Sequence, residues 1–414
     1  MDTGIDRQYD IVVFGATSFV GRILCAYLKE RHGSSGDRSS DGVSWAIAGR
    51  NRQKLDALAA DLDLAVDVIV ADAADIDALA SLARSTRVVI STVGPYSLYG
   101  SELVEAAAIA GTDYCDLTGE PHWMQQMIDA HEKTATSTGA RIVHACGFDS
   151  IPSDLGVWYT QQQAQEILGE HCNQISMRVK AIKGGASGGT IASMLTTIEQ
   201  AKADPEIRRT LTNPYALAPI GMRAGVRQNN VNVPMRDEAS KRWVAPFIMA
   251  SVNTRVVHRS HALMGRPWGA DFLYDEAVLA GHGIGGALRA GGTSIGLGGA
   301  LAALSVAPVR GLLADKVLPK PGEGPSPEQQ AAGFFDLRFY GTTSSGADII
   351  TKVTGDRDPG YGSTAKMLGE TAYCLLQRDP ADTPGGFWTP STALGQPLVD
   401  QLEAFAGLTF SLVG

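Results

Sequence analysis

Residues 10–21 read DIVVFGATSFVG, a short apolar run followed by a turn that is bounded by glycines. The apolar residues predict a buried strand, and the spacing of apolar residues from Phe19 onward predicts a helix directly after the turn. This context is typical of the phosphate-binding turn of a Rossmann-type fold. Gly15 would let a pyrophosphate approach the backbone, Gly21 would let the helix pack closely on the strand, and the helix start offers N–H groups. Ser18 replaces the usual middle glycine, although its hydroxyl can itself donate to a phosphate. The alternative is a plain strand-to-helix turn that binds nothing.

The first 155 residues alternate short apolar runs with helical patterns. Such alternation indicates βαβ units and a parallel sheet. We therefore predict an α/β fold, with a Rossmann-type doubly wound parallel sheet and an inserted α+β second domain. The expected strands are residues 10–14, 43–48, 66–71, 87–92, 114–117 and 141–145. The expected helices between them are residues 19–31, 52–61, 76–84, 102–110 and 121–137.

The end of the second strand decides which nicotinamide dinucleotide the fold would hold. An NAD site places an acidic residue there, but residues 48–52 read AGRNR and contain none. Arg50 would instead bind a 2′-phosphate through charge-assisted hydrogen bonds, so we predict NADPH. Arg52 and Lys54 are either helpers or solvated helix charges. Asp72, after the third strand, would lie near the adenine or cap a helix.

Residues 92–96 read TVGPY and end the fourth strand. Ligands of doubly wound sheets bind beyond the carboxyl ends of the strands, so Gly94 would let the cofactor approach and Pro95 would fix the turn. Tyr96 and Tyr99 would then lie near the nicotinamide, where a phenol can protonate a substrate oxygen, or both rings simply pack. The predicted cofactor-binding residues are Gly15, Thr17, Ser18, Phe19, Val20, Gly21, Arg50, Asn51, Lys54, Asp72, Thr92, Val93, Gly94 and Pro95.

The chain changes character after Asp154, with expected strands at residues 175–183, 244–257 and 334–340 and helices at 190–203 and 363–377. Residues 290–309 carry no charge, but glycine and serine dilute their hydropathy. We expect a buried apolar hairpin or a membrane-surface patch there and not a membrane span. The predicted domains are a dinucleotide-binding domain (1–160), an α+β substrate domain (161–350) with a Gly-rich apolar segment (281–311), and a C-terminal segment (351–414) that packs back on the first domain.

Composition excludes several classes of protein. The net charge of −9 argues against nucleic-acid binding, and the charged residues, at 19%, are too few for a disordered chain. Five widely spaced cysteines without a CxxC pair indicate free thiols in a reducing compartment. The first ten residues show no secretory signal, so we expect a cytoplasmic protein. His258 and His261 have helical spacing but lack a third ligand, so no metal site is predicted.

The chain resembles the saccharopine dehydrogenase-like oxidoreductases. The resemblance lies in GATSFVG (15–21), AGR (48–50), STVGPYSLYG (91–100), CDLTGE (115–120), HACGFDSIPSDLG (144–156) and DPGYGSTAKML (358–368). Within that family it is most similar to the trans-acting enoyl reductases of mycobacterial lipid biosynthesis, which serve polyketide synthases without an enoyl reductase domain. Asp149 aligns with the acid of the family's G-x-D-P-G loop. Ser150 and Ile151 depart from its proline and final glycine, so saccharopine itself is not the predicted substrate.

The resemblance implies an NADPH-dependent reductase of an enoyl thioester. Its expected partners are a polyketide synthase and a long-chain acyl or polyketide thioester bound to a carrier, and a homodimer and peripheral membrane contact stay open. The predicted catalytic residues are Tyr96, Tyr99, Asp149 and Ser150. His144 and Cys146 are more simply explained as structural. The alternatives are an NADP-dependent dehydrogenase acting at a C=N or C=O bond and a non-catalytic lipid-associated protein that binds a nucleotide.

Overall fold

The chain forms two compact units in the computed structural model, which describes residues 7–34, 42–185, 188–223, 225–305 and 323–413. Unit 1 comprises Met1–Gly147 and Thr364–Gln401, and unit 2 comprises Phe148–Ser363 and Leu402–Gly414. The domain ranges expected from the sequence (1–160, 161–350 and 351–414) stay predictions.

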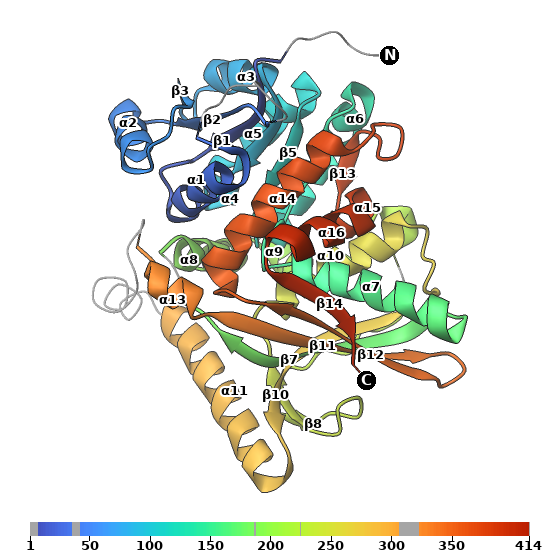
Figure 1. Cartoon of the computed structure of the whole chain (residues 1–414). Coiled ribbons are helices and arrows are strands. Elements are labelled where there is room, and N and C mark those ends of the chain that lie inside the picture. Colours follow the sequence, from blue (N-terminus) through green and yellow to red (C-terminus); the bar gives the residue numbers. More distant parts are fainter. Residues whose placement is uncertain (1–6, 35–41, 186–187, 224, 306–322, 414) are drawn as a thin grey trace. The chain divides into compact units, whose positions relative to one another are not determined.

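Unit 1 is built around seven parallel strands. They are β1 (Tyr9–Phe14), β2 (Trp45–Gly49), β3 (Asp67–Val70), β4 (Thr86–Ser91), β5 (Asp113–Asp116), β6 (Arg141–Val143) and β13 (Gly386–Trp388). Their order is β13-β6-β5-β4-β1-β2-β3, so the direction of winding reverses between β1 and β4 (Figure 1). Ile11, Val12 and Val13 are completely buried, which places the core along the central strand β1. This is the predicted doubly wound Rossmann-type sheet.

Helices follow these strands as the sequence predicts, and the C-terminal part of the chain completes the unit. The helices are α1 (Phe19–His32), α2 (Arg52–Asp61), α3 (Ile76–Ser85), α4 (Tyr96–Tyr99), α5 (Ser101–Ala110), α6 (Pro121–Thr138), α14 (Thr364–Gln377) and α15 (Pro390–Ala393). α14 packs against α1, β4 and β5. The Glu370 carboxylate on α14 accepts hydrogen bonds from the Tyr27 hydroxyl and, at 3.1 Å, from Arg31 Nε on α1. Arg141, paired with Asp113, donates to the carbonyl oxygen of Arg378 at 2.9 Å, just after α14.

Unit 2 contains a second, mixed sheet. Its strands are β7 (Cys172–Lys183), β8 (Met235–Arg236), β9 (Trp243–Pro246), β10 (Leu273–Gly281), β11 (Phe334–Thr343), β12 (Asp348–Gly355) and β14 (Leu408–Leu412). Their order is β14-β12-β11-β7-β10-β9-β8, and only the β7–β10 pair is parallel among these described strands. β11 and β12 alternate between buried and more accessible residues, so one face of the sheet packs in the core. α7 (Ile151–Leu168) contacts β7, β11 and β12.

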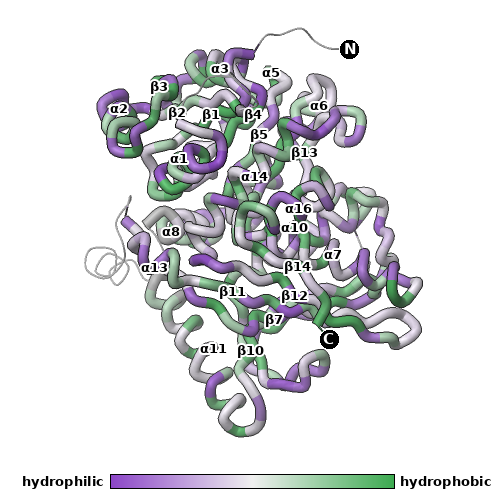
Figure 2. Tube along the Cα trace, viewed as in Figure 1, coloured by the Kyte–Doolittle hydropathy of each residue, from purple (hydrophilic) through white to green (hydrophobic). Residues whose placement is uncertain are grey.

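Unit 2 also contains further described helical elements, several of which are labelled in Figure 2. They are α8 (Gly188–Ala203), α9 (Pro205–Thr212), the 3₁₀ turn η1 (Ile220–Met222), α10 (Ala250–Leu263), α11 (Gly283–Ser305), α13 (Pro327–Ala331) and the π-helical turn η2 (Pro359–Ser363). α16 (Gly395–Phe405) contains the last boundary between the units. None of the helices in the described part of the chain is both long enough and apolar enough to cross a membrane.

Two predicted elements are wrong. The strand expected at residues 244–257 ends at Pro246, and α10 follows it. Val252, Val256 and Val257 are buried within this helix, and such β-branched residues favour a strand in the sequence. The apolar hairpin expected within residues 290–309 is the single helix α11 as far as Ser305, and residues 306–309 lie outside the described residues.

Candidate functional site

The turn between β1 and α1 is too tight for side chains at either end. Gly15 has a φ of +85°, and a Cβ atom added to it would lie 2.5 Å from Cγ2 of Val93. A Cβ added to Gly21 would lie 2.3 Å from the carbonyl oxygen of Gly15. The two glycines therefore let α1 begin directly against the turn, with its N-terminal end at the carboxyl edge of the sheet.

Ser18 and Thr92 connect this turn to the end of β4. Ser18 Oγ accepts a hydrogen bond from the Gly21 N–H at 2.9 Å and donates to Oγ1 of Thr92, also at 2.9 Å. Oγ1 of Thr92 donates in turn to the carbonyl oxygen of Gly15 at 2.9 Å. The ends of β1 and β4, where the winding reverses, are thus held together by side chains. The Ser18 proton is engaged in this link, so the hydroxyl would have to rotate before it donated to a phosphate.

The residues around Ser18 differ in accessibility. Thr17 is exposed, Phe19 is half-buried and Val20 is buried. In the β4 loop, Val93 is half-buried, Gly94 is exposed and Pro95 is buried. The exposed surface of both loops is therefore mostly backbone and small residues, which suits the close approach of a phosphate group.

Arg50 lies exposed just after β2, and no residue in the described ranges pairs with its side chain. Arg52, by contrast, forms an ion pair with Asp56, with 2.8 Å between Nε and Oδ1. Asn51 caps α2 by accepting a hydrogen bond from the Lys54 N–H at 3.0 Å, and Lys54 is exposed. Among the described residues, the side chains of Arg50 and Lys54 are therefore unpaired at this strand end, whereas that of Arg52 is not.

Asp72 lies exposed beyond β3, and its Oδ1 accepts a hydrogen bond from the Ala74 N–H at 3.0 Å. The alternative that Asp72 caps the following helix is wrong, because Asp75 accepts the hydrogen bond from the Ala78 N–H and caps α3.

The two predicted catalytic tyrosines have different environments. Tyr96 is buried, and its hydroxyl donates to the carbonyl oxygen of Ser91 at 2.9 Å, so its phenol is engaged within the protein. This placement favours packing as the role of Tyr96. Tyr99, at the other end of α4, has 46% of its surface exposed and is accessible to a ligand.

Asp149 and Ser150 belong to unit 2 and precede α7. The half-buried carboxylate of Asp149 has no hydrogen-bond or ion-pair partner among the described residues. Burial raises the pKa of Asp149 to about 6. Ser150 is completely buried and donates to Oδ1 of Asn253 at 3.2 Å. Asp149 therefore has a carboxyl group free to act on a ligand, whereas the Ser150 hydroxyl is tied to α10.

No protein-family model matches the chain. A Mycobacterium tuberculosis protein that is provisionally named a trans-acting enoyl reductase is 39% identical over 418 residues, covering 97% of both chains. The trans-acting enoyl reductase of Mycobacterium bovis is 36% identical and covers 96% of both chains. This chain belongs to the trans-acting enoyl reductase family. It is an oxidoreductase, and the resemblance stated from its motifs is confirmed.

A solved structure supports the fold of this enoyl reductase family member. Apo saccharopine dehydrogenase (L-Glu forming) from Saccharomyces cerevisiae aligns with a TM-score of 0.52 at 13% identity. The alignment covers 98% of this chain and all of that chain. The likeness confirms the predicted α/β architecture of a Rossmann-type domain with a second α+β part.

A buried polar cluster that the sequence motifs did not predict lies at the ends of β5 and β6 in this reductase family member. His144 Nδ1 lies 2.7 Å from Oδ2 of Asp116, and Oδ1 of Asp116 accepts a hydrogen bond from the Ala145 N–H at 3.1 Å. The Glu120 carboxylate accepts hydrogen bonds from the N–H groups of Tyr96 and Ser97 at 2.8 and 3.0 Å. The cluster holds the loops after β4, β5 and β6 in place. The acidic positions in CDLTGE were a signal for it, but their partners lie far away in the sequence.

A second missed network lies in unit 2. Nδ2 of Asn253 donates to Glu276 at 2.9 Å, and the Tyr274 hydroxyl donates to the same carboxyl group at 2.7 Å. Burial raises the pKa of Glu276 to about 7. Through Asn253, this network fixes Ser150 beside Asp149.

His258 and His261 lie on α10 among aromatic rings. His261 stacks on Trp268 with 4.9 Å between the ring centroids, and His258 lies 4.9 Å from the Tyr215 ring. The described residues contain no group of three His, Cys, Asp or Glu side chains that could hold a metal ion.

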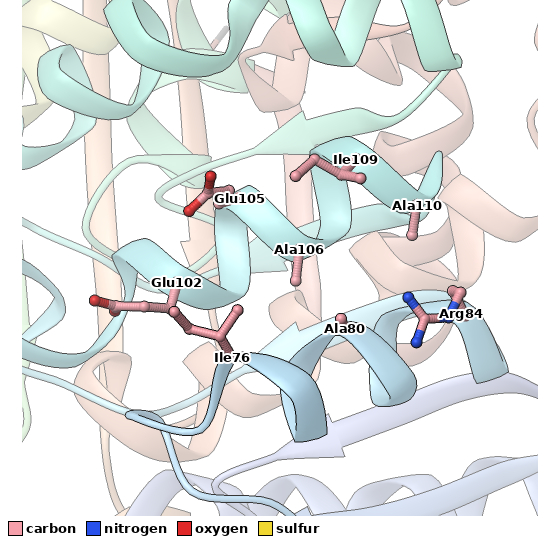
Figure 3. A pocket seen from close by; sticks show the side chains of 8 residues that line it. All are labelled: Ile76, Ala80, Arg84, Glu102, Glu105, Ala106, Ile109 and Ala110. Carbon is pink, nitrogen blue, oxygen red and sulfur yellow. The ribbon is translucent and has the colours of Figure 1, made fainter.

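A groove lies between α3 and α5 of unit 1 (Figure 3). Its lining combines small and branched apolar side chains with three charged ones: Ile76, Ala80, Arg84, Glu102, Glu105, Ala106, Ile109 and Ala110. Ile76 and Ile109 are 65% and 62% exposed. The groove contains neither a histidine nor a hydroxyl group, and none of the predicted site residues lines it.

Proposed function

We propose that the protein is an NADPH-dependent reductase of an enoyl thioester that carries a long acyl or polyketide chain. The observation that carries the proposal is the linked turn of Gly15, Ser18 and Thr92 at the point where the sheet reverses, in a chain related over its full length to trans-acting enoyl reductases. In doubly wound sheets this position is the usual site of a dinucleotide.

The residues present suit NADPH. The glycine-bounded turn and the start of α1 would receive the pyrophosphate, because neither Gly15 nor Gly21 has a side chain in the way. Arg50 would receive the 2′-phosphate, since its guanidinium is exposed and free of partners among the described residues. The loop after β2 contains no carboxylate that would favour the 2′-hydroxyl of NADH before Asp56, which is paired with Arg52.

In this proposal the bound cofactor supplies a hydride to the β-carbon of the double bond. Negative charge then develops on the thioester oxygen and needs a hydrogen-bond donor. Tyr99 is the exposed phenol available for this role, and the backbone N–H groups of residues 147–150 are further candidates. The α-carbon must gain a proton. Asp149 is suited to deliver it, because burial raises the pKa of its carboxyl group to about 6.

We further propose that the substrate arrives bound to a carrier and that the protein serves a polyketide synthase in the cytoplasm. The support is the name of its relatives, which calls them trans-acting.

The test is to incubate the purified protein with NADPH and a long-chain trans-2-enoyl thioester. We expect loss of NADPH absorbance together with a product heavier than the substrate by two hydrogen atoms. The saturated thioester is the control and should give no oxidation. Turnover with keto or imino acids but not with the enoyl thioester would replace the proposal with a saccharopine dehydrogenase-type activity. Binding of NADPH without turnover of either class would indicate a non-catalytic lipid-associated protein.

A further inference from the structure

The outward face of α11 is unusually apolar. Ile284, Leu288 and Ile295 are 83%, 72% and 78% exposed. At about 100° per residue, these three positions lie within roughly 40° of one another around the helix. The opposite side of α11 contacts β9 and β10, where Gly286 and Ala290 are buried. Contiguous exposed apolar surface of this kind marks an interaction site in a water-soluble protein.

Charge is absent from this face. The charged residue on α11 is Arg289, whose Nε donates to the carbonyl oxygen of Ala280 at 2.8 Å. A Cβ added to Gly281 would lie 2.5 Å from Nη2 of Arg289, so the guanidinium lies back against its own chain. The sequence has no acidic residue between Glu276 and Asp315, although the chain carries a net charge of −9. Two copies would therefore repel each other least if they met along α11.

We propose that α11 pairs with α11 of a second copy of this chain in antiparallel orientation. Along the exposed face, Leu288, Gly292, Ile295 and Gly299 alternate large and small. When the helix is reversed about its 293–294 peptide bond, Leu288 faces Gly299 of the other copy and Ile295 faces Gly292. Each large side chain then meets a glycine, which allows close approach of the two helices. A twofold interface requires this self-complementarity.

The same face suits a lipid surface less well. Helices that lie in a membrane interface combine aromatic residues with lysines or arginines beside the apolar strip. α11 contains no tryptophan, phenylalanine or lysine, and its arginine is engaged. The helix is about 34 Å long. A contact along one helix of this length buries an area at the small end of the range for stable dimer interfaces, so we expect association that depends on protein concentration.

Sedimentation velocity of the full chain, from about 1 to about 100 µM, tests the proposal. The wild type should shift from monomer to dimer, and Ile295→Glu should raise the dimer Kd at least tenfold, because it places a charge in the apolar strip. The matched control is Ile109→Glu, another exposed isoleucine on a helix of unit 1, which should leave the Kd unchanged. A circular dichroism melt checks that each variant is folded.

Gly299→Leu separates the two occupants of the face. A Cβ atom added at this position meets nothing within 4 Å in the single chain, and Gly299 is exposed, so the fold should tolerate the substitution. It should weaken the dimer, since it fills the space for Leu288 of the other copy, whereas it would strengthen binding to a lipid surface. A wild type that stays monomeric, a Gly299→Leu variant that dimerises like the wild type, or flotation of the monomer with phosphatidylcholine vesicles would overturn the proposal.

Discussion

Arg50 differs from Arg52 in what its side chain touches. Arg52 is paired with Asp56, whereas Arg50 has no partner in the described part of the chain. Arg50→Ala should weaken NADPH binding roughly 10- to 100-fold, because a hydrogen bond to a charged group contributes about 1.5–3 kcal/mol, and it should barely change NADH binding. Fluorescence titration with both cofactors measures this. Arg52→Ala is the control and should have little effect. Equal losses for NADPH and NADH would contradict the role of Arg50.

Asp149 gives the reaction an expected pH dependence. Burial raises the pKa of its carboxyl group to about 6, so the acid form that can deliver a proton declines as the pH rises above 6. The rate of enoyl thioester reduction should fall over that range. Asp149→Asn should lower the rate and remove this titration, whereas Asp77→Asn, which changes an exposed carboxylate of unit 1, should preserve it. An unchanged pH profile in Asp149→Asn would remove Asp149 from the mechanism.

At the scale of elements, the junction of β1 and α1 depends on the absence of a side chain at Gly21. A methyl group there would lie 2.3 Å from the Gly15 carbonyl oxygen, so α1 must move away from the turn. Gly21→Ala should lower the free energy of unfolding by about 1–3 kcal/mol and weaken NADPH binding. Gly285→Ala is the control, because a methyl group there meets nothing within 4 Å. Chemical denaturation measures both, and equal stability of the two variants would contradict the tight turn.

α10 carries two histidines that stay neutral in the folded protein. Burial lowers the pKa of His258 to about 3 and that of His261 to about 4, from an ordinary value of 6.5. Their contribution to stability is complete above pH 6.5 and is lost as the pH falls, because the unfolded chain binds protons that the folded chain does not. His258 should add about 1.4 kcal/mol per pH unit to the slope as the pH falls from 6 to 4, and His261 should add less near pH 4, where its folded form also binds protons. His258→Phe should reduce that slope by this amount in urea titrations, and an unchanged slope would contradict it.

The sequence predicts the elements that carry a clear apolar pattern. β1, α1, α2 and α3 lie within two residues of their expected bounds, because β1 is a continuous apolar run and each of the three helices buries one side. α7 could not be predicted, since it is buried on most sides and loses the 3.6-residue period, and the β-branched residues of α10 favour a strand. Arg50 follows β2 and Tyr99 follows β4, and both side chains are accessible. The Asp116–His144 contact joins residues 28 apart, so its geometry depends on pairing between β5 and β6, which no local pattern encodes.

At the scale of the whole molecule, unit 1 combines an N-terminal segment, Met1–Gly147, with a C-terminal segment, Thr364–Gln401. A ligand of the β1–α1 turn should therefore protect distant residues. At 100 times its Kd, NADPH should add about 2.7 kcal/mol to the stability of the unit that binds it. Hydrogen exchange should slow in α14 and β13 as well as in β1 and β4. Protection confined to residues 7–147 would contradict the assignment of Thr364–Gln401 to this unit.

β13 also bears on the order of events during synthesis on a ribosome. The seventh strand of the parallel sheet consists of Gly386–Trp388, and the helix covering α1, β4 and β5 is α14. A nascent chain that has emerged only as far as β6 must keep an open sheet edge and an uncovered apolar face while more than two hundred further residues are translated. The protein thus has a long interval in which chaperones would have to shield its N-terminal segment, and a premature stop before residue 364 would leave unit 1 permanently incomplete.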